Sequence, residues 1–209
     1  MRCLWSVGTG VPVTDKRRSC PDVLLTFVLS CTGEGICKSP APVKPFDYRN
    51  YLGFWYEIGK IQTPGGGEYQ ANCVCTFSET TPSNLPLAAD SDAGVVYACH
   101  DTKPDGPWLN ATGILTDMDP NLPGVWTETF FPFTPIAFEL KYFVVDMDTA
   151  GIEYAMEYDC SETDYCVHIF ARQPIIENKQ LQTLVEKANK MGLNPLNLPF
   201  VLTNHEGCW

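Results

Sequence analysis

Eight short segments with the character of β-strands follow one another in this chain, and they limit the folds open to it. They span residues 54–61, 72–79, 94–101, 109–117, 124–131, 137–146, 152–160 and 166–172. Clusters of Gly, Pro, Asp and Asn separate them, as is typical of turns. Eight sequential strands with short connections favour an antiparallel up-and-down barrel, because closure leaves no unpaired strand edge. A barrel of this size has room for one small ligand.

Hydrophobic and polar side chains alternate in several of these segments. In residues 152–160 the two faces differ sharply: Tyr154, Met156 and Tyr158 oppose Glu153, Glu157 and Asp159. A period of two with one acidic face indicates a wet side and an apolar side. We therefore expect the aromatic set to line the barrel interior.

The pattern changes after the last strand. Residues 177–191 contain no Gly or Pro, and apolar side chains recur at intervals of three and four residues. Gly192 follows as a helix stop. The fold expected is therefore all-β: an eight-stranded antiparallel up-and-down β-barrel with one C-terminal α-helix packed on its outside.

Ten cysteines in 209 residues indicate an oxidising compartment and structural disulfides, because their spacing lacks the paired Cys-x2-Cys of zinc sites. The formal net charge of −11 disfavours nucleic-acid binding. We expect no metal site and no required cofactor.

The N-terminal region resembles an export signal. Basic residues 16–18 precede the apolar run 23–29, which is too short to span a bilayer. We therefore expect residues 1–36 to be a signal peptide and leader, and residues 37–209 to form the folded domain. The protein is expected to be secreted and extracellular, without stable membrane insertion. Asn110 begins an Asn-Ala-Thr sequon and is a candidate glycosylation site.

The segment YLGFWYEI, residues 51–58, carries the most specific signal. Gly53 precedes Trp55 by two residues, and a buried Trp needs a partner for its indole N–H. Near the other end of the strand region stands Ala-Arg-Gln-Pro, containing Arg172. Gly-x-Trp in the first strand, eight strands, this Arg and a following helix together resemble the lipocalin family. The resemblance implies that the Arg172 guanidinium lies across Trp55 at the closed base of the barrel.

Within that family the chain is most similar to the apolipoprotein D, bilin-binding and crustacyanin branch, over roughly residues 37–208. The resemblance implies two disulfides, Cys37–Cys160 and Cys73–Cys208. Cys75 and Cys99 fall on the second and third predicted strands, so a third bridge between them is expected. Cys166 is then either free or, if the leader is cut before Cys31, paired with that residue.

The sequence contains no Gly-x-Ser-x-Gly, His-Glu-x-x-His or phosphate-binding loop, so we expect no enzyme. Cys166 and His168 share the parity of Arg172, and a thiol beside an imidazole could act as a nucleophile. A lipid-modifying enzyme of lipocalin fold using Cys166 is therefore the alternative. Another is a pigment-assembling subunit of a carotenoprotein complex, forming a homo- or hetero-oligomer.

The expected function is the binding and transport of one small hydrophobic ligand in the barrel cavity. By the resemblance, this ligand is a retinoid, carotenoid, bilin, sterol or fatty acid, or a non-covalent chromophore. His168 and Phe170 are the strongest candidates for contact with it, since they share the parity of Arg172. The full set expected to line the cavity is His168, Phe170, Tyr154, Met156, Tyr158, Phe138, Tyr142, Tyr97 and Phe77.

Overall fold

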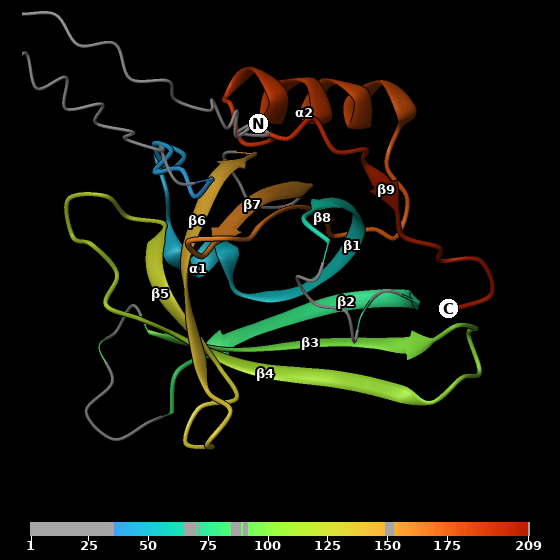
Figure 1. Ribbon diagram of the computed structural model, residues 1–209, viewed down its shortest axis with the longest axis horizontal. Helices are drawn as coiled ribbons and strands as arrows, with labels where there is room; N and C mark the ends of the chain where they lie inside the picture. Colours follow the sequence, from blue (N-terminus) through green and yellow to red (C-terminus); the bar gives the residue numbers. More distant parts are fainter. Residues whose placement is uncertain are drawn as a thin grey trace, which may run out of the picture. The chain divides into compact units, whose positions relative to one another are not determined.

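The computed structural model describes residues 36–64, 70, 72–84, 89, 92–148 and 153–208. Within them, eight strands form an antiparallel up-and-down barrel (Figure 1). The strands are β1 (Gly53–Gln62), β2 (Cys73–Pro82), β3 (Ala93–Asp101), β4 (Trp108–Thr116), β5 (Val125–Phe130), β6 (Phe138–Met147), β7 (Tyr154–Cys160) and β8 (Tyr165–Ala171). Each strand pairs with its sequence neighbour, and β1 closes the barrel by pairing with both β8 and β2. The predicted fold class is confirmed.

Three shorter or separate elements complete the described part of the chain: the helices α1 (Tyr48–Tyr51) and α2 (Asn178–Lys190), and the two-residue strand β9 (Val201–Leu202). The predicted signal peptide and leader lie outside the described residues, except for Ile36. No helix among the residues with a described structure is long and apolar enough to cross a lipid bilayer.

Trp55 and Arg172 close the base of the barrel, as the sequence predicts. The guanidinium carbon of Arg172 lies 3.5 Å from the centroid of the Trp55 ring. The guanidinium also donates hydrogen bonds to three backbone carbonyls near the start of β1: Phe54 at 2.6 Å, Leu52 at 2.8 Å and Asn50 at 2.9 Å. The Trp55 indole N–H donates to the Tyr51 carbonyl at 2.8 Å. The buried indole N–H and the guanidinium therefore both have backbone carbonyl acceptors at this junction.

Gly53 allows this junction to form. Its φ of +102° lies in a region that side chains with a Cβ rarely adopt, and a Cβ here would lie 3.3 Å from an Arg172 guanidinium nitrogen. Any other residue would be strained and would crowd the guanidinium. The glycine thus serves both the turn from α1 into β1 and the approach of Arg172.

Helix α2 covers the outer face of the barrel wall formed by β1 and β6–β8 (Figure 1). Its buried residues Leu184 and Ala188 belong to a core that includes Met156, Tyr158 and Ile169. The ammonium group of Lys187 pairs with Asp146 of β6 at 2.7 Å and holds the helix in place. This core lies outside the barrel, so the wall has an apolar surface on the helix side.

The helix reverses the expected orientation of β7. Met156 and Tyr158 pack beneath α2, and Tyr154 lies beside them with its hydroxyl donating to Asp146 at 3.3 Å. The prediction that these three residues line the interior is therefore wrong. The alternation of polar and apolar side chains along β7 shows that its two faces differ, but it does not show which face points into the barrel. The apolar face packs against the nearest apolar surface, and here that surface belongs to α2 on the outside of the barrel.

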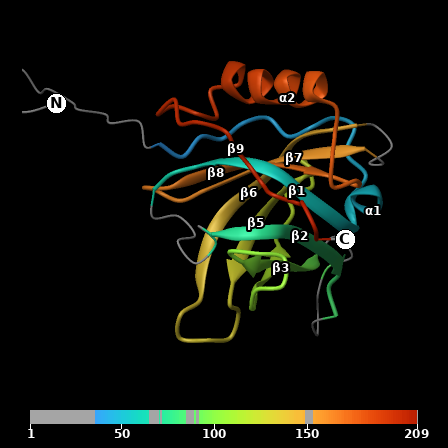
Figure 2. The same cartoon turned by 90° about the vertical axis from the view of Figure 1, so that its right-hand side faces the viewer.

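The C-terminal tail lies along the gap that opens where β1 and β2 diverge. These two strands pair only over Gly53–Tyr56, and beyond that point β9 pairs with β1 (Figure 2). The backbone N–H of Cys75 on β2 donates to the Asn204 carbonyl at 2.9 Å. The tail therefore bonds to both strands and fills the gap with backbone hydrogen bonds.

Three disulfides join six of the seven described cysteines: Cys37–Cys160, Cys73–Cys99 and Cys75–Cys208. The first was predicted, but the expected Cys73–Cys208 and Cys75–Cys99 bridges are wrong because the partners are exchanged. The strand register shifts between Val74 and Phe77, and Cys75 has a φ of 58°. This bulge turns Cys75 toward the tail and leaves Cys73, opposite Asp101, diagonal to Cys99.

We expect the Arg172→Met substitution to lower the free energy of unfolding by roughly 3 kcal/mol, since it removes a cation–π contact and three charge-assisted hydrogen bonds. Urea unfolding with the disulfides intact measures this change. Arg49→Ala is the control: Arg49 is exposed and, among the described residues, forms an ion pair with Asp47 alone, so its loss should cost less than about 0.5 kcal/mol. Equal stability of Arg172→Met and the native protein would contradict the role given to Arg172.

Candidate functional site

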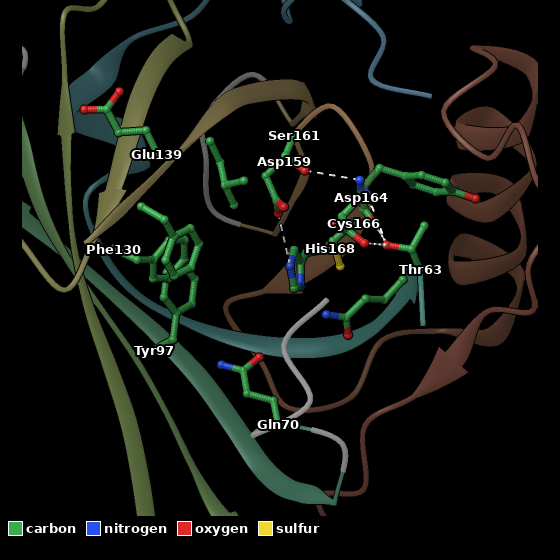
Figure 3. Close-up of a pocket in the computed structure, with 14 residues that line it drawn as sticks. Thr63, Gln70, Tyr97, Phe130, Glu139, Asp159, Ser161, Asp164, Cys166 and His168 are labelled. Atoms are coloured by element: carbon green, nitrogen blue, oxygen red, sulfur yellow. Dashed lines mark hydrogen bonds and ion pairs between the residues drawn. The ribbon is translucent and has the colours of Figure 1, made fainter. Parts of the chain in front are cut away.

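A cavity of about 350 Å³ lies inside the barrel (Figure 3). It is lined by the end of β1 and the start of β8, whereas Trp55 and Arg172 lie at the opposite ends of these strands. Its lining comes from several strands and from the loops beside them. The lining residues are Gln62, Thr63, Gln70, Tyr97, Phe130, Phe138, Glu139, Leu140, Asp159, Ser161, Asp164, Tyr165, Cys166 and His168. They form two walls of different chemistry, one aromatic and one polar.

The aromatic wall is built by β3, β5 and β6. Phe130 lies between Tyr97 and Phe138 and stacks on both, with ring centroids 5.7 Å and 5.1 Å away. Antiparallel pairing brings Phe130 directly opposite Phe138. Leu140 follows on the same face of β6 and extends this wall. The stacked rings present a continuous apolar surface to the cavity.

The polar wall is built by β7 and β8 and faces the aromatic wall (Figure 3). The strand register places Asp159 directly opposite Cys166 and Glu157 directly opposite His168. His168 is held between two carboxylates: its Nδ1 lies 2.9 Å from Glu57 of β1, and its Nε2 lies 3.4 Å from Asp159.

Glu57 anchors this wall from the neighbouring strand. It is buried, and it pairs with Lys60 at 3.4 Å and accepts a hydrogen bond from the Thr203 hydroxyl at 2.7 Å. Burial acts to raise the pKa of Glu57, but Lys60 and His168 outweigh it and hold this pKa well below its usual value. Glu57 is thus a carboxylate with three partners, one of them from the tail.

The neighbouring groups also set the protonation of His168 and Cys166. Burial alone would lower the pKa of His168, but Cys166, Asp159 and Glu57 together raise it well above its usual value. Burial raises the pKa of the Cys166 thiol. The carboxylates of Glu57 and Asp159 therefore favour the imidazolium form of His168, while burial favours the protonated form of Cys166.

Two further carboxyl groups are buried deeper in the barrel, between the cavity and the base. Glu128 of β5 accepts a hydrogen bond from the Tyr97 hydroxyl at 3.0 Å. Glu157 of β7 accepts one from the Tyr51 hydroxyl at 2.5 Å, and Tyr51 in turn contacts the Tyr142 hydroxyl. Burial raises the pKa of Glu157 to about 7 and that of Glu128 well above its usual value. Neither carboxyl forms an ion pair with a cationic side chain in the described structure.

The nine residues expected to line the cavity fall into four groups. His168, Tyr97 and Phe138 lie on its surface. Phe170 and Tyr142 point into the barrel but are buried in the core around Trp55, below the cavity. The three β7 residues lie under α2, as described above. Contact between any of these residues and a ligand stays a prediction.

The fourth group is Phe77 alone, which points away from the cavity. Its ring stacks on Phe54, with centroids 4.6 Å apart, and lies near the exposed Trp108. Ser78, the next residue, is directly opposite Trp55 and buried with it. Because neighbours on a strand face opposite sides, Phe77 must lie on the outer face.

The interpretation of the sequence missed part of both walls. Phe130 lies on the same face of β5 as Trp126 and Glu128, which are both buried. The sequence of this strand alone does not indicate which of its two faces points into the barrel. Asp159 was assigned to the solvent side because it is acidic. Its parity with Glu157, opposite His168, was the available signal, since His168 was already expected inside.

Two covalent modifications predicted from the sequence, a disulfide of Cys166 and glycosylation of Asn110, involve residues away from the base of the barrel. Cys166 is a free, buried thiol in the described structure, whereas its alternative partner Cys31 lies outside the described residues. Asn110 is exposed on β4, and its glycosylation stays a prediction.

An up-and-down barrel of eight strands that is closed at one end and hollow at the other has the architecture of the β-barrels whose interior can hold one small molecule. A family model described as a lipocalin-like domain matches residues 46–202, which include all eight barrel strands. The chain therefore belongs to the lipocalin family, as the Gly-x-Trp and Arg172 signals predicted.

Comparison with known proteins agrees with this assignment. Apolipoprotein D of Mus musculus is 27% identical over 165 residues, covering 77% of this chain and 78% of that protein. Among solved structures, insecticyanin from the tobacco hornworm has a TM-score of 0.61 at 20% identity, covering 83% of this chain and 88% of that one. Lobster apocrustacyanin A1 has a TM-score of 0.55 at 16% identity, covering 76% and 79%. These two structures show a shared fold.

The buried Glu128 predicts a pH dependence of stability. Its pKa is higher in the folded chain than in the unfolded chain, so the proton is lost from the unfolded chain first as the pH rises. Below about pH 4.3, the pKa of this side chain in the unfolded chain, the contribution of Glu128 to the free energy of unfolding is fully present. Above that pH, the free energy of unfolding falls by up to about 1.4 kcal/mol per pH unit until the pH passes the folded-state pKa. Glu128→Gln should remove this loss, so the variant gains stability relative to the native protein between pH 5 and pH 8.

Urea unfolding at several pH values measures this difference. Glu139→Gln is the matched control, because Glu139 borders the same cavity but is exposed to solvent. Parallel pH profiles for the native protein and Glu128→Gln would show that Glu128 is not held protonated by burial.

Proposed function

We propose that this protein is an extracellular carrier that binds one small hydrophobic molecule, bearing a polar group, in the open end of its barrel. The observation that carries the proposal is the pairing of an aromatic wall with a polar wall across one cavity. The apolar body of the ligand would lie against Phe130, Phe138 and Leu140. Its polar group would lie toward His168 and Asp159, where hydrogen-bonding partners are available.

The size of the cavity narrows the choice of ligand. Ligand pockets commonly measure about 300–1,000 Å³, and this one, at about 350 Å³, is near the lower limit. A compact ligand such as a retinoid, a sterol or a fatty acid suits that volume. A carotenoid or a bilin would extend through the mouth, where Phe133 and Ile136 of the β5–β6 loop are exposed.

An extracellular location is supported by the disulfides. The three bridges of the described structure connect the leader side, β2, β3, β7 and the tail. Such bridges persist in oxidising compartments and are rare in the cytosol. Assembly with further subunits stays a prediction.

The state of Cys166 favours binding over nucleophilic catalysis. A catalytic cysteine needs a thiolate, and burial raises the pKa of this thiol instead of lowering it. His168, its neighbour on β8, already has its ring nitrogens directed at Glu57 and Asp159. The imidazole therefore interacts with two carboxylates as well as with the thiol, and its interaction with the thiol does not offset the effect of burial on the thiol pKa.

Titration with retinol, a polyene with a single hydroxyl, tests the proposal through quenching of tryptophan fluorescence. We expect saturable binding of one retinol per chain. Phe130→Ala should weaken it by about tenfold, because it removes the central ring of the aromatic wall. Phe77→Ala is the matched control: the same side chain is lost from the outer face of the barrel. A sterol and a fatty acid, added as competitors, would rank the candidate ligand classes.

Equal affinities of the two phenylalanine variants would place the bound molecule outside the cavity and contradict the proposal. Failure of retinol, the sterol and the fatty acid alike to bind the native protein would also contradict it.

A further inference from the structure

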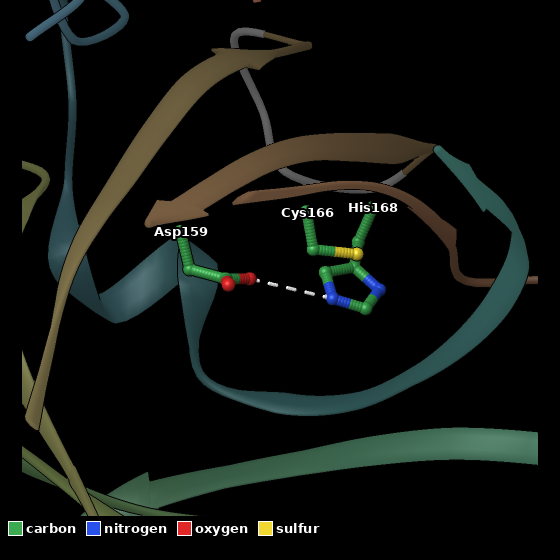
Figure 4. A group of neighbouring side chains, drawn as sticks. All are labelled: Asp159, Cys166 and His168. Atoms are coloured by element: carbon green, nitrogen blue, oxygen red, sulfur yellow. Dashed lines mark ion pairs between the residues drawn. The ribbon is translucent and has the colours of Figure 1, made fainter. Parts of the chain in front are cut away.

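Three side chains with metal-binding donor atoms meet on the polar wall of the cavity. They are the carboxylate of Asp159, the thiol of Cys166 and the imidazole of His168 (Figure 4). Their donor atoms all lie within 4.8 Å of one another. We propose that these three residues form a binding site for a divalent transition-metal ion such as Zn²⁺.

The separation of two donor atoms already matches a bound ion. Nε2 of His168 and Oδ2 of Asp159 are 3.4 Å apart. In a tetrahedral zinc site with metal–nitrogen and metal–oxygen distances near 2.0–2.1 Å, neighbouring ligand atoms are about 3.4 Å apart. The same separation is long for a hydrogen bond between an imidazole and a carboxylate. A zinc ion could therefore bind both atoms without a change in their separation.

Glu57 orients His168 for this role. Its Oε2 lies 2.9 Å from Nδ1, so Nδ1–H donates to Glu57 and Nε2 is directed at the site. A carboxylate behind a ligating histidine is the usual arrangement in protein metal sites, since it selects the tautomer and holds the ring. Lys60 and the Thr203 hydroxyl fix Glu57 in turn. The orientation is therefore built from β1, β8 and the tail together.

The free thiol is the feature that a simple ion-pair network leaves unexplained. The two carboxylates of Glu57 and Asp159 already provide ion-pair partners for His168, so the network does not require Cys166. Yet Cys166 is 4% exposed, lines the cavity directly opposite Asp159 in the strand register, and forms no disulfide in the described structure. Coordination of a metal ion by its sulfur would account for a free thiol at this position.

The donor set indicates the kind of ion. One sulfur, one nitrogen and one oxygen suit Zn²⁺ or Co²⁺, whereas Mg²⁺ and Ca²⁺ prefer oxygen ligands alone. Binding would release one proton from the thiol and one from Nε2, so the two positive charges of the ion would replace the two positive charges of these protons. The net charge of the buried group, including Glu57 and Lys60, stays unchanged.

Three protein ligands leave one tetrahedral position open. All three residues line the cavity, so the open position faces its interior. Water, or a polar group of a bound molecule, could complete the coordination there. The inference does not depend on the proposed carrier function, because metal binding has its own readout without retinol.

Titration of the full-length, disulfide-bonded protein with Co²⁺ tests the site by absorption spectroscopy. We expect one Co²⁺ per chain, with a thiolate-to-cobalt charge-transfer band that added Zn²⁺ abolishes. Cys166→Ser should remove the band, and His168→Gln and Asp159→Asn should each weaken binding by at least about tenfold. His100→Gln is the control, because His100 lies on the outer face beside Trp108 and should leave the titration unchanged.

The variants also separate Cys166 from the three cysteines at positions 3, 20 and 31, which lie outside the described residues. Near-UV circular dichroism checks that each variant is folded. If Cys166→Ser does not fold, the affinities of His168→Gln and Asp159→Asn decide the question. Absence of the charge-transfer band in the native protein, or its persistence in the folded Cys166→Ser variant, would overturn the proposal. Unchanged affinity in both His168→Gln and Asp159→Asn would do so as well.

Discussion

The contact between the Arg172 guanidinium and the Trp55 ring determines which side chains face the barrel interior. It holds the start of β1 and the end of β8 together at the base. Because strand residues alternate, the contact also sets the inward face of β8: Phe170, then His168, then Cys166. On β1 the same rule brings Glu57 inside, two residues after Trp55. The histidine and the carboxylate therefore meet because the base fixes both strands.

Helix α2 has the opposite effect on the same wall. It gives the outer faces of β6–β8 an apolar partner, so the aromatic side chains of β7 turn outward and its carboxyl groups turn inward. Carboxyl groups in a barrel interior are costly without partners. Here hydroxyls of Tyr51 and Tyr97 and the ring of His168 supply the partners. An amphipathic helix outside the barrel thus makes the cavity polar on one side.

The parts of the fold that depend on local pattern could be predicted from the sequence. Turn clusters gave the number of strands, the spacing of Leu and Ala gave the helix, and Arg172 gave the parity of β8. The inward face of β7 could not be predicted, because alternation does not say which face the helix covers. The exchange of Cys73 and Cys75 could not be predicted either. It follows from a bulge and a positive φ at Cys75, and no glycine or turn residue in the sequence marks that position.

The charge balance of the polar wall bears on what the cavity can accept. Glu57 and Asp159 are matched by Lys60 and His168, so this group of four side chains is balanced in charge when His168 is protonated. A ligand with a net charge would disturb this balance inside a barrel where burial raises the energy of any unpaired charge. A neutral ligand with one hydrogen-bonding group, such as retinol or a sterol, would not, so we expect these two to bind more tightly than a fatty acid, which fits the volume but is ionised at neutral pH. The same balance tolerates a divalent ion only because ligands can release two protons in exchange. We therefore expect the cavity to favour a ligand or ion whose binding leaves its charge unchanged.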